Sequence, residues 1–328
     1  MEIKKIIIVT RPTRLKQALR RFNTKKQTEF FINSRGQSFE DYELEEDNYK
    51  TARDLLLNSI PRDLGFQEVD REFLPNFIFA PGDVVVTLGQ DGLVVNVAKY
   101  LKGQPVIAVN PDPERFDGVL MPFLAGDLER AVRCLTKDTF KTRNITMGRA
   151  DLNDGQSLLA FNDFFIGPKN QSSARYTIHH RERSERQISS GIVISTPAGS
   201  TGWLSSFMNM TAGINMFLGK EKAPAAPDML KSSSKKSNNR MEPSVHMDWE
   251  ERRMVFMVRE PFRSKWSQTE IVAGEIDTKT ELTLESHMPE DGVIFSDGML
   301  DDFLEFNSGS TVQIRLAQDT VRLVTELL

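Results

Sequence analysis

The stretch VVVTLGQDGLVVNVAKYL, residues Val84 to Leu101, joins an apolar strand-like run to a Gly-Gln-Asp-Gly turn and a helical pattern. A strand that passes through a short turn into a helix is the repeating unit of parallel α/β sheets. Two interpretations of the turn are open. It is a plain connection in which Gly and Asp serve local backbone needs, or a phosphate-binding loop with a carboxylate at its centre.

The residues on either side repeat this strand-and-helix alternation. Ile6–Val9 and Val106–Val109 predict buried strands, and the pattern AGDLERAVRCL, residues 125–135, predicts a helix. Alternating strands and helices predict a Rossmann-like, mostly parallel sheet. We therefore expect an α/β nucleotide-binding domain over residues 1–140.

Strand patterns dominate from residue 141 onward and predict a mainly antiparallel, β-rich domain over residues 141–328. The last segment, residues 316–328, is expected to pack on either domain. Residues 219–248 are rich in Lys, Ser, Pro and Asn, with little to bury, and predict a mobile insertion.

The bulk composition limits the function classes. The chain has 328 residues and a net charge of -4, which argues against a nucleic-acid or membrane-surface binder. It has no apolar run of the ~20 residues that a membrane span needs. The single cysteine suits a reducing compartment, and no targeting segment is evident, so we expect a cytoplasmic protein.

Gly89 and Gly92 enclose Asp91 at a predicted strand end that opens a helix. Ligands of parallel sheets collect at the carboxyl ends of strands, and a helix N-terminus offers unpaired N–H groups to phosphate. An Asp repels phosphate, so its presence makes sense if it accepts a proton from a hydroxyl that attacks the phosphate.

Two further segments suit a nucleotide. After a predicted strand at Gly191–Ser195, the chain is rich in small and hydroxylated residues, which suit phosphate or ribose, although a Ser/Thr helix cap is the alternative. Asn162 and Asp163 interrupt an apolar strand pattern, LLAFNDFFIG, where a polar pair must find partners. The pair is either a structural turn or bulge, or a contact to a base or ribose.

In this order, the three segments resemble the signatures of the NAD kinase family: a Gly-Gly-Asp-Gly loop, an Asn-Glu pair and a Thr-Pro-Thr-Gly-Ser-Thr-Ala-Tyr-type loop. Within the family, the chain is most similar to the mitochondrial-type NAD kinases and their bacterial relatives. That likeness rests on VIAVNPDPERFDGVL, FNDFFIGPKNQSSARY, QISSG and MVFMVREPF. The similarity runs from the first strand to GVIFSDGMLDDFLEFNSGS, outside the 219–248 insertion.

The resemblance implies an ATP- and Mg²⁺-dependent phosphorylation of the 2′-hydroxyl of the NAD adenosine ribose. It implies a cleft between the two domains, a homodimer or higher oligomer, and Asp91 as the general base. Metal ligands within the protein are not expected. The residues implied to bind nucleotide are Gly89, Gln90, Gly92, Asn110, Asn162, Asp163, Ser190, Thr196, Pro197, Ala198, Gly199, Ser200, Thr201, Gly202 and Trp203, with Arg11 and Asp297 as secondary candidates.

Several positions depart from the family pattern. Gln90 replaces the second Gly of the loop, which costs roughly 1–2 kcal/mol if that position needs a positive φ. Asp163 replaces a Glu, Leu93 stands where Thr is common, and Trp203 replaces a Tyr; Ser190 matches the mitochondrial branch. Two alternatives follow: a weakened or inactive nucleotide-binding homologue, and a kinase of the same superfamily that acts on a sugar or lipid hydroxyl.

Overall fold

The computed structural model describes residues 2–22, 24–219, 246–299 and 302–328. Within this range the chain divides into two compact units. Unit 1 comprises residues 1–144 and 321–328, and unit 2 comprises residues 145–320. The sequence predicts the boundary at residue 140. Most of the predicted 219–248 insertion lies outside the described residues.

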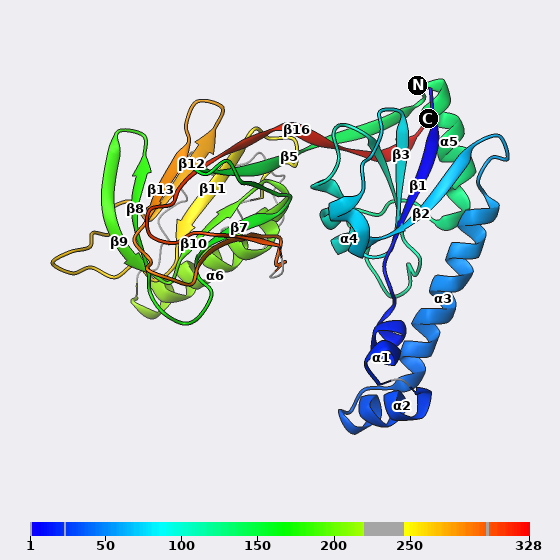
Figure 1. Cartoon of the computed structure of the whole chain (residues 1–328), viewed down its shortest axis with the longest axis horizontal. Helices are drawn as coiled ribbons and strands as arrows, with labels where there is room; N and C mark the ends of the chain where they lie inside the picture. Colours follow the sequence, from blue (N-terminus) through cyan, green and yellow to red (C-terminus); the bar gives the residue numbers. More distant parts are fainter. Residues whose placement is uncertain (1, 23, 220–245, 300–301) are drawn as a thin grey trace. The chain divides into compact units, whose positions relative to one another are not determined.

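Unit 1 is an α/β unit (Figure 1). Its elements are β1 (Lys5–Thr10), α1 (Arg14–Phe22), α2 (Lys25–Ser34), α3 (Phe39–Asn58), β2 (Gly65–Asp70), η1 (Arg71–Asn76), β3 (Asp83–Leu88), α4 (Asp91–Ala98), β4 (Pro105–Val109), η2 (Ala125–Asp127) and α5 (Leu128–Lys137). The long strands β5 (Phe140–Leu152) and β16 (Thr311–Leu327) each contribute residues to both units.

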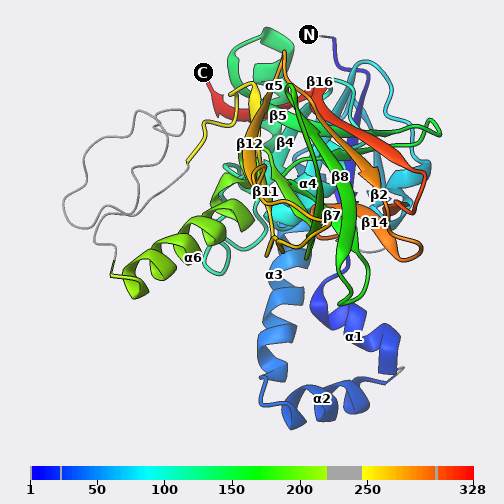
Figure 2. The ribbon, with the colours of Figure 1, turned by 90° about the vertical axis from the view of Figure 1, so that its left-hand side faces the viewer.

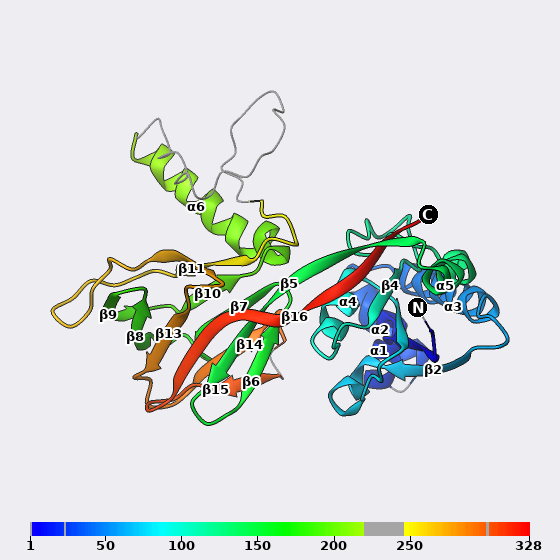
Figure 3. The same ribbon diagram turned by 90° about the horizontal axis from the view of Figure 1, so that it is seen from above.

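The parallel sheet of unit 1 has the strand order β2-β1-β3-β4, followed by the end of β16, where Arg322 and Leu323 pair with β4 in parallel. Its inner strands β1, β3 and β4 are buried on both faces, as expected for a sheet covered on both sides, whereas the edge strand β2 is largely exposed. α3 and α5 pack on one face through residues such as Leu56 and Leu128, and α4 lies on the other side (Figures 1 and 3). The predicted parallel α/β sheet is confirmed.

The segment between β1 and β2 is more extensive than a simple crossover. α1 and α2 pack against the first turns of α3 through Leu15, Ile32 and Phe39 (Figure 2). Ser38 caps α3, because its hydroxyl accepts a hydrogen bond from the N–H of Asp41. α1 and α2 therefore form a small apolar core of their own with the N-terminal end of α3.

Unit 2 consists of two antiparallel sheets and one helix (Figure 3). Its remaining elements are β6 (Ser157–Ala160), β7 (Asp163–Pro168), β8 (Ala174–His180), β9 (Arg183–Ser189), β10 (Ile192–Ser195), η3 (Ala198–Thr201), α6 (Trp203–Phe217), β11 (Arg253–Val258), β12 (Ala273–Asp277), β13 (Leu282–Ser286), β14 (Gly292–Ser296) and β15 (Phe303–Glu305).

One sheet of unit 2 has the order β12-β11-β10-β7-β14-β15. The other contains β6, β5, β16, β13, β8 and β9. Their inner faces share one apolar core, in which Phe164, Ile194 and Phe256 of the first sheet pack with Tyr176 and Leu284 of the second. The predicted antiparallel, β-rich domain is confirmed.

Candidate nucleotide site

Three neighbouring parallel strands of unit 1 end at the same level. Thr10 of β1 pairs with Leu88 of β3, and Leu88 pairs with Val109 of β4. The next residues along the chain, Arg11, Gly89 and Asn110, therefore begin three adjacent loops at one edge of the sheet. This edge is where parallel α/β sheets bind ligands.

The loop after β3 leads directly into α4. A Cβ at Gly89 would lie 2.9 Å from Cδ2 of Leu93, so a larger residue there would displace that buried side chain. A Cβ at Gly92 would meet nothing within 4 Å, and the fold itself does not require this glycine. Gln90 has φ -97° and precedes the helix as its N-cap. It needs no positive φ, and the strain cost considered for this position does not arise.

Asp91 is the first residue of α4 and is half-buried. Its Oδ1 accepts a hydrogen bond of 2.7 Å from the N–H of Leu120. Within the described chain, Oδ2 has no hydrogen-bond donor. One oxygen thus fixes the carboxylate while the other is available to a ligand or a proton.

Arg11 lies beside this loop. It lines a small pocket together with Gly89, Gln90 and Tyr49. Burial lowers the pKa of its guanidinium, and the nearby positive charge of Arg71 lowers it further. No ion pair to Arg11 occurs among the described residues. A half-buried guanidinium outside any ion pair of the described residues is suited to bind an anion.

Asn110 uses its side chain inside the protein. It is 5% exposed, its Oδ1 accepts from the N–H of Asp112 at 3.0 Å, and its Nδ2 donates to the carbonyl of Phe116 at 2.9 Å. Gly118 is required beside it, because a Cβ there would lie 2.7 Å from Nδ2. Asn110 therefore shapes the turn that carries Pro111 and Asp112, two further residues of the pocket lining.

The sequence pattern suggested that Asn162 and Asp163 interrupt one continuous strand. In unit 2 they instead lie where one strand ends and the next begins. β6 ends at Ala160 and β7 begins at Asp163. The break is held by the carboxylate of Asp297, which accepts from the N–H groups of Phe161 (3.1 Å), Asn162 (2.6 Å) and Asp163 (3.4 Å). These backbone N–H groups therefore find their acceptor more than 130 residues away in the chain.

Asp297 itself occupies the left-handed region with φ 55°, followed by Gly298 with φ 69°. Asp tolerates this conformation because its short side chain is sterically undemanding. The predicted Asp-Gly turn thus aims its carboxylate at the backbone of another strand.

The loop after β10 packs on the same break. Thr196 is fully buried, its hydroxyl donates to the carbonyl of Phe161 at 2.5 Å, and its N–H donates to the carbonyl of Asn162 at 2.9 Å. A Cβ at Gly199 would lie 2.1 Å from the carbonyl oxygen of Asn162. Only glycine permits this close approach of two backbone segments.

The predicted residues of this loop therefore fall into two sets. Thr196, Pro197, Gly199 and Ser200 are buried and build the loop, while Ala198 is half-buried and Thr201, Gly202 and Trp203 are exposed. Trp203 also packs edge-on against Phe165, with 6.1 Å between ring centroids. The exposed set offers the surface that a ligand can reach.

Ser190 is half-buried, and its N–H donates to the carbonyl of Arg259. The preceding Ser189 is buried, and its hydroxyl joins that of Tyr176 at 2.8 Å and accepts from the N–H of Gly191 at 3.0 Å. Gly191 has φ 109°, a conformation that side chains disfavour. The backbone around Ser190 is therefore firmly fixed.

Known proteins resemble the chain in part of its sequence and in its fold. No family model matches the chain. The NAD kinases of Saccharolobus islandicus (strain M.14.25 / Kamchatka #1) and Saccharolobus solfataricus (strain P2) are each 28% identical to it over 153 residues. The match covers 47% of this chain and 55% of each relative, so the chain spans about half the length of the curated relatives it matches.

Solved structures give the fold. Yeast NADH kinase complexed with NADH aligns with a TM-score of 0.55 at 13% identity, over 99% of this chain and 84% of that chain. An NAD kinase from Archaeoglobus fulgidus in complex with ATP aligns with a TM-score of 0.50 at 13% identity, over 97% and 92%. The chain is similar to NAD kinases in part of its sequence and in its fold. The predicted resemblance to that family is confirmed.

The sequence alone does not single out Glu45 and Tyr49, which line the unit 1 pocket. Both residues come from α3, about 40 residues before Gly89. In the sequence they belong to an ordinary charged helical stretch. Only their burial, 6% exposed for both Glu45 and Tyr49, marks them.

The side chains around the pocket fit a metal ion that is bound mainly by the phosphates of a nucleotide. Within residues 2–22, 24–219, 246–299 and 302–328, no group of three or more His, Cys, Asp or Glu side chains is placed to hold a metal ion. Mg²⁺ commonly keeps several waters and binds through substrate phosphates and one or two carboxylates. None of the helices in the described part of the chain has the length and apolar character that a membrane span requires.

Proposed function

We propose that this protein is an NAD kinase that transfers the γ-phosphoryl group of ATP to the 2′-hydroxyl of the NAD adenosine ribose. The products are NADP and ADP. The observation that carries the proposal is Asp91, whose carboxylate is fixed by the N–H of Leu120 and keeps one oxygen available at the N-terminus of α4. The sequence and fold similarity to NAD kinases supports the same reaction.

In the proposed reaction, the ribose 2′-oxygen forms a bond to the γ-phosphorus while the bond from that phosphorus to the β–γ bridging oxygen breaks. Asp91 accepts the proton of the 2′-hydroxyl, and ADP leaves with the bridging oxygen. Mg²⁺ that arrives with the ATP phosphates would neutralise their charge. The protein contributes positioning and one proton acceptor.

The phosphate donor is assigned to the pocket of unit 1. Arg11 supplies a positive charge, and Gly89, Gln90 and Gly92 border the start of α4, whose N-terminal N–H groups suit phosphate oxygens. The adenosine of NAD is assigned to unit 2, at Asn162 and Asp163, with Ser190 and the exposed residues after Ala198.

The reading of the chain as a weakened or inactive homologue is less well supported. That alternative rests mainly on Gln90, but the backbone of this residue has a negative φ, which any amino acid adopts. Leu93, the second departure, is buried, and its side chain lies close to Gly89. A homodimer or higher oligomer, a cytoplasmic location and the mitochondrial-type branch are further parts of the proposal.

The test is a coupled assay on the purified protein with ATP, Mg²⁺ and NAD, in which an NADP-specific dehydrogenase reports NADP. We expect continuous NADP formation that requires all three components. NAD binding by calorimetry without turnover would instead support the binding-only homologue. Turnover of ATP only with a sugar or lipid acceptor would assign the protein to another kinase of the superfamily.

A further inference from the structure

The pocket beside Gly89 contains two buried carboxylates that oppose an anionic ligand. Glu45 and Asp112 line it together with Arg11, and their side chains are only 7% and 6% exposed. Buried charges cost several kcal/mol each unless they are paired. A polyphosphate that enters the pocket meets these two negative charges, so their neutralisation decides whether the pocket accepts it.

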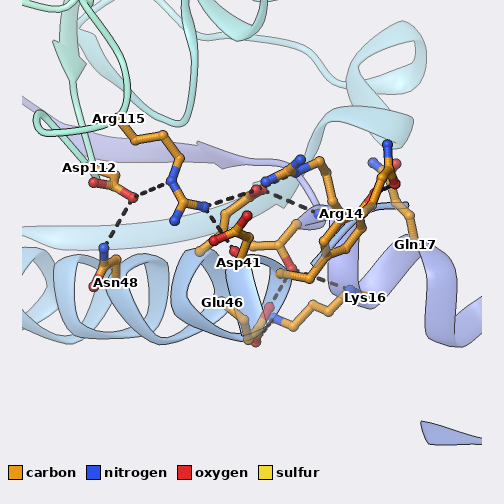
Figure 4. Close-up of polar contacts among 12 residues, drawn as sticks. Arg14, Lys16, Gln17, Asp41, Glu46, Asn48, Asp112 and Arg115 are labelled. Carbon is orange, nitrogen blue, oxygen red and sulfur yellow. Dashed lines mark hydrogen bonds and ion pairs between the residues drawn. The ribbon is translucent and has the colours of Figure 1, made fainter. Parts of the chain in front are cut away.

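Arg115 serves both carboxylates. It lies in the turn after β4, and its Nε is 3.6 Å from Oδ2 of Asp112 while its Nη1 is 3.7 Å from Oε2 of Glu45 (Figure 4). Nη1 also donates to the main-chain carbonyl of Asp41 on α3 at 2.9 Å. Its side chain is 24% exposed, which limits screening by solvent.

The other partners each reach one carboxylate. Arg14 bonds Glu45 at 2.5 Å but is 42% exposed, and Asn48 donates to Asp112 at 3.1 Å without contributing charge. The pocket-lining charges and the guanidinium groups that touch them are therefore Arg11, Arg14 and Arg115 against Glu45 and Asp112. The net charge of these five groups is +1, and it falls to zero without Arg115.

Another carboxylate of α3, that of Glu46, does not contribute to the net charge of the pocket. Glu46 accepts from the hydroxyl of Thr13 and pairs with Lys16 and Lys50, and it does not line the pocket (Figure 4). These contacts fix α3 to the start of α1. The link between α3 and the turn after β4 runs through Arg115 and Asn48.

We propose that Arg115 is a positioning residue of the phosphate-donor pocket: it neutralises Glu45 and Asp112 and holds the turn after β4 against α3, so that Arg11 and the Gly89 loop present a net positive site. This inference rests on the proposed function for the identity of the ligand. The charge arrangement itself holds for any polyphosphate.

The test is calorimetric titration of the full chain with MgATP. Arg115→Gln is expected to weaken binding about tenfold, the effect of exposing an anion to an uncompensated charge a few ångströms away. The triple variant Arg115→Gln, Glu45→Gln, Asp112→Asn should recover affinity to within about threefold of the wild type, because no carboxylate is left to neutralise. Arg133→Gln, an exposed arginine on α5, is the matched control and should bind as the wild type does.

The outcomes separate charge from architecture. If Arg115→Gln binds within about twofold of the wild type, or if the triple variant is no tighter than Arg115→Gln, the inference is overturned. If Arg115→Gln does not fold, Glu45→Gln alone decides: binding about threefold tighter supports the inference and unchanged or weaker binding overturns it.

The same titration distinguishes this inference from the proposed function. Wild-type protein that binds MgATP but makes no NADP contradicts the NAD kinase assignment, while the variant series still decides the role of Arg115. Wild-type protein that does not bind MgATP overturns both.

Discussion

At the scale of single residues, Asp297 has a larger role than its place in a hairpin turn suggests. Its carboxylate accepts hydrogen bonds from three consecutive N–H groups, those of Phe161, Asn162 and Asp163. A carboxylate in this arrangement replaces the missing strand partner at the break between β6 and β7. The orientation of Asn162 and Asp163 therefore depends on a side chain distant in sequence.

Replacing Asp297 tests this dependence. Asp297→Ala leaves three N–H groups without their acceptor, and we expect a loss of about 1–3 kcal/mol in unfolding free energy. We also expect the Kd for NAD, measured by calorimetry, to rise at least about tenfold. Asp154→Ala removes an Asp from an exposed turn of the same unit, where it accepts from the N–H of Gln156, and should leave NAD affinity unchanged. Equal NAD affinity in both variants would show that Asp297 does not organise the site.

At the scale of elements, the loop between β10 and α6 and the break between β6 and β7 form one interlocked structure. Gly199 is the point of closest approach, since a Cβ there would lie 2.1 Å from the carbonyl oxygen of Asn162. The two segments cannot move apart without breaking the hydrogen bonds of Thr196 to Phe161 and Asn162. Small residues in this loop are thus required by packing as well as by any ligand.

Gly199→Ala should separate the two segments. We expect it to lower the unfolding free energy by about 1–3 kcal/mol, as overpacking does, and to abolish detectable NAD binding in calorimetry. Gly213→Ala, in the middle of α6 where a Cβ meets nothing within 4 Å, is the matched control. It should raise stability by up to about 1 kcal/mol and keep NAD binding. Intact NAD binding in Gly199→Ala would contradict the interlocked arrangement.

A second connection between elements joins α3 to β3. The hydroxyl of Tyr49 donates to the carbonyl of Leu88, one residue before Gly89, at 3.3 Å. Burial raises the pKa of Tyr49 to about 12. The folded state therefore holds the tyrosine proton more tightly than the unfolded state, where the pKa is about 10. The stabilisation is complete below pH 10 and is lost as the pH rises through 12.

Tyr49→Phe should show the corresponding pH dependence. At pH 7 it loses the hydrogen bond, and we expect it to be about 1 kcal/mol less stable than the wild type in urea unfolding. Between pH 10 and 12 the wild type should lose stability faster, so the difference should close or reverse, since one pKa unit corresponds to about 1.4 kcal/mol. Tyr42→Phe, also on α3 with an exposed hydroxyl, should follow the wild-type curve. Parallel curves for wild type and Tyr49→Phe would contradict the connection.

At the scale of the whole molecule, local patterns predict the fold of each unit well. The apolar runs that end at Leu88 and Val109 are strands, and Asp91 begins a helix, because alternation and turn residues are local signals. These signals also place Arg11, Gly89 and Asn110 at neighbouring strand ends, through the parallel order of the sheet.

The remaining features depend on contacts between distant segments. Nothing near Asn162 in the sequence indicates that Asp297 will hold it, and nothing near Arg115 indicates Glu45, 70 positions earlier. Asn110 has the composition of a ligand contact, yet both ends of its amide are used inside its own turn. Burial and pairing of polar groups are properties of the folded chain, so a single sequence does not show them.

The central claim is that Asp91 accepts the proton of the ribose hydroxyl. The direct measurement is the steady-state rate of NADP formation by Asp91→Asn in the coupled assay. Asn keeps an oxygen that can accept from the N–H of Leu120, so the loop should retain its geometry. Asp117→Asn, at an exposed position in the turn after β4 that also contains Leu120, is the matched control.

We expect Asp91→Asn to lower kcat by about 10²–10⁴-fold, the usual contribution of a general base, with ATP and NAD affinities within about threefold of the wild type. The control should turn over at the wild-type rate. An unchanged kcat in Asp91→Asn, with wild-type affinities, would contradict the account.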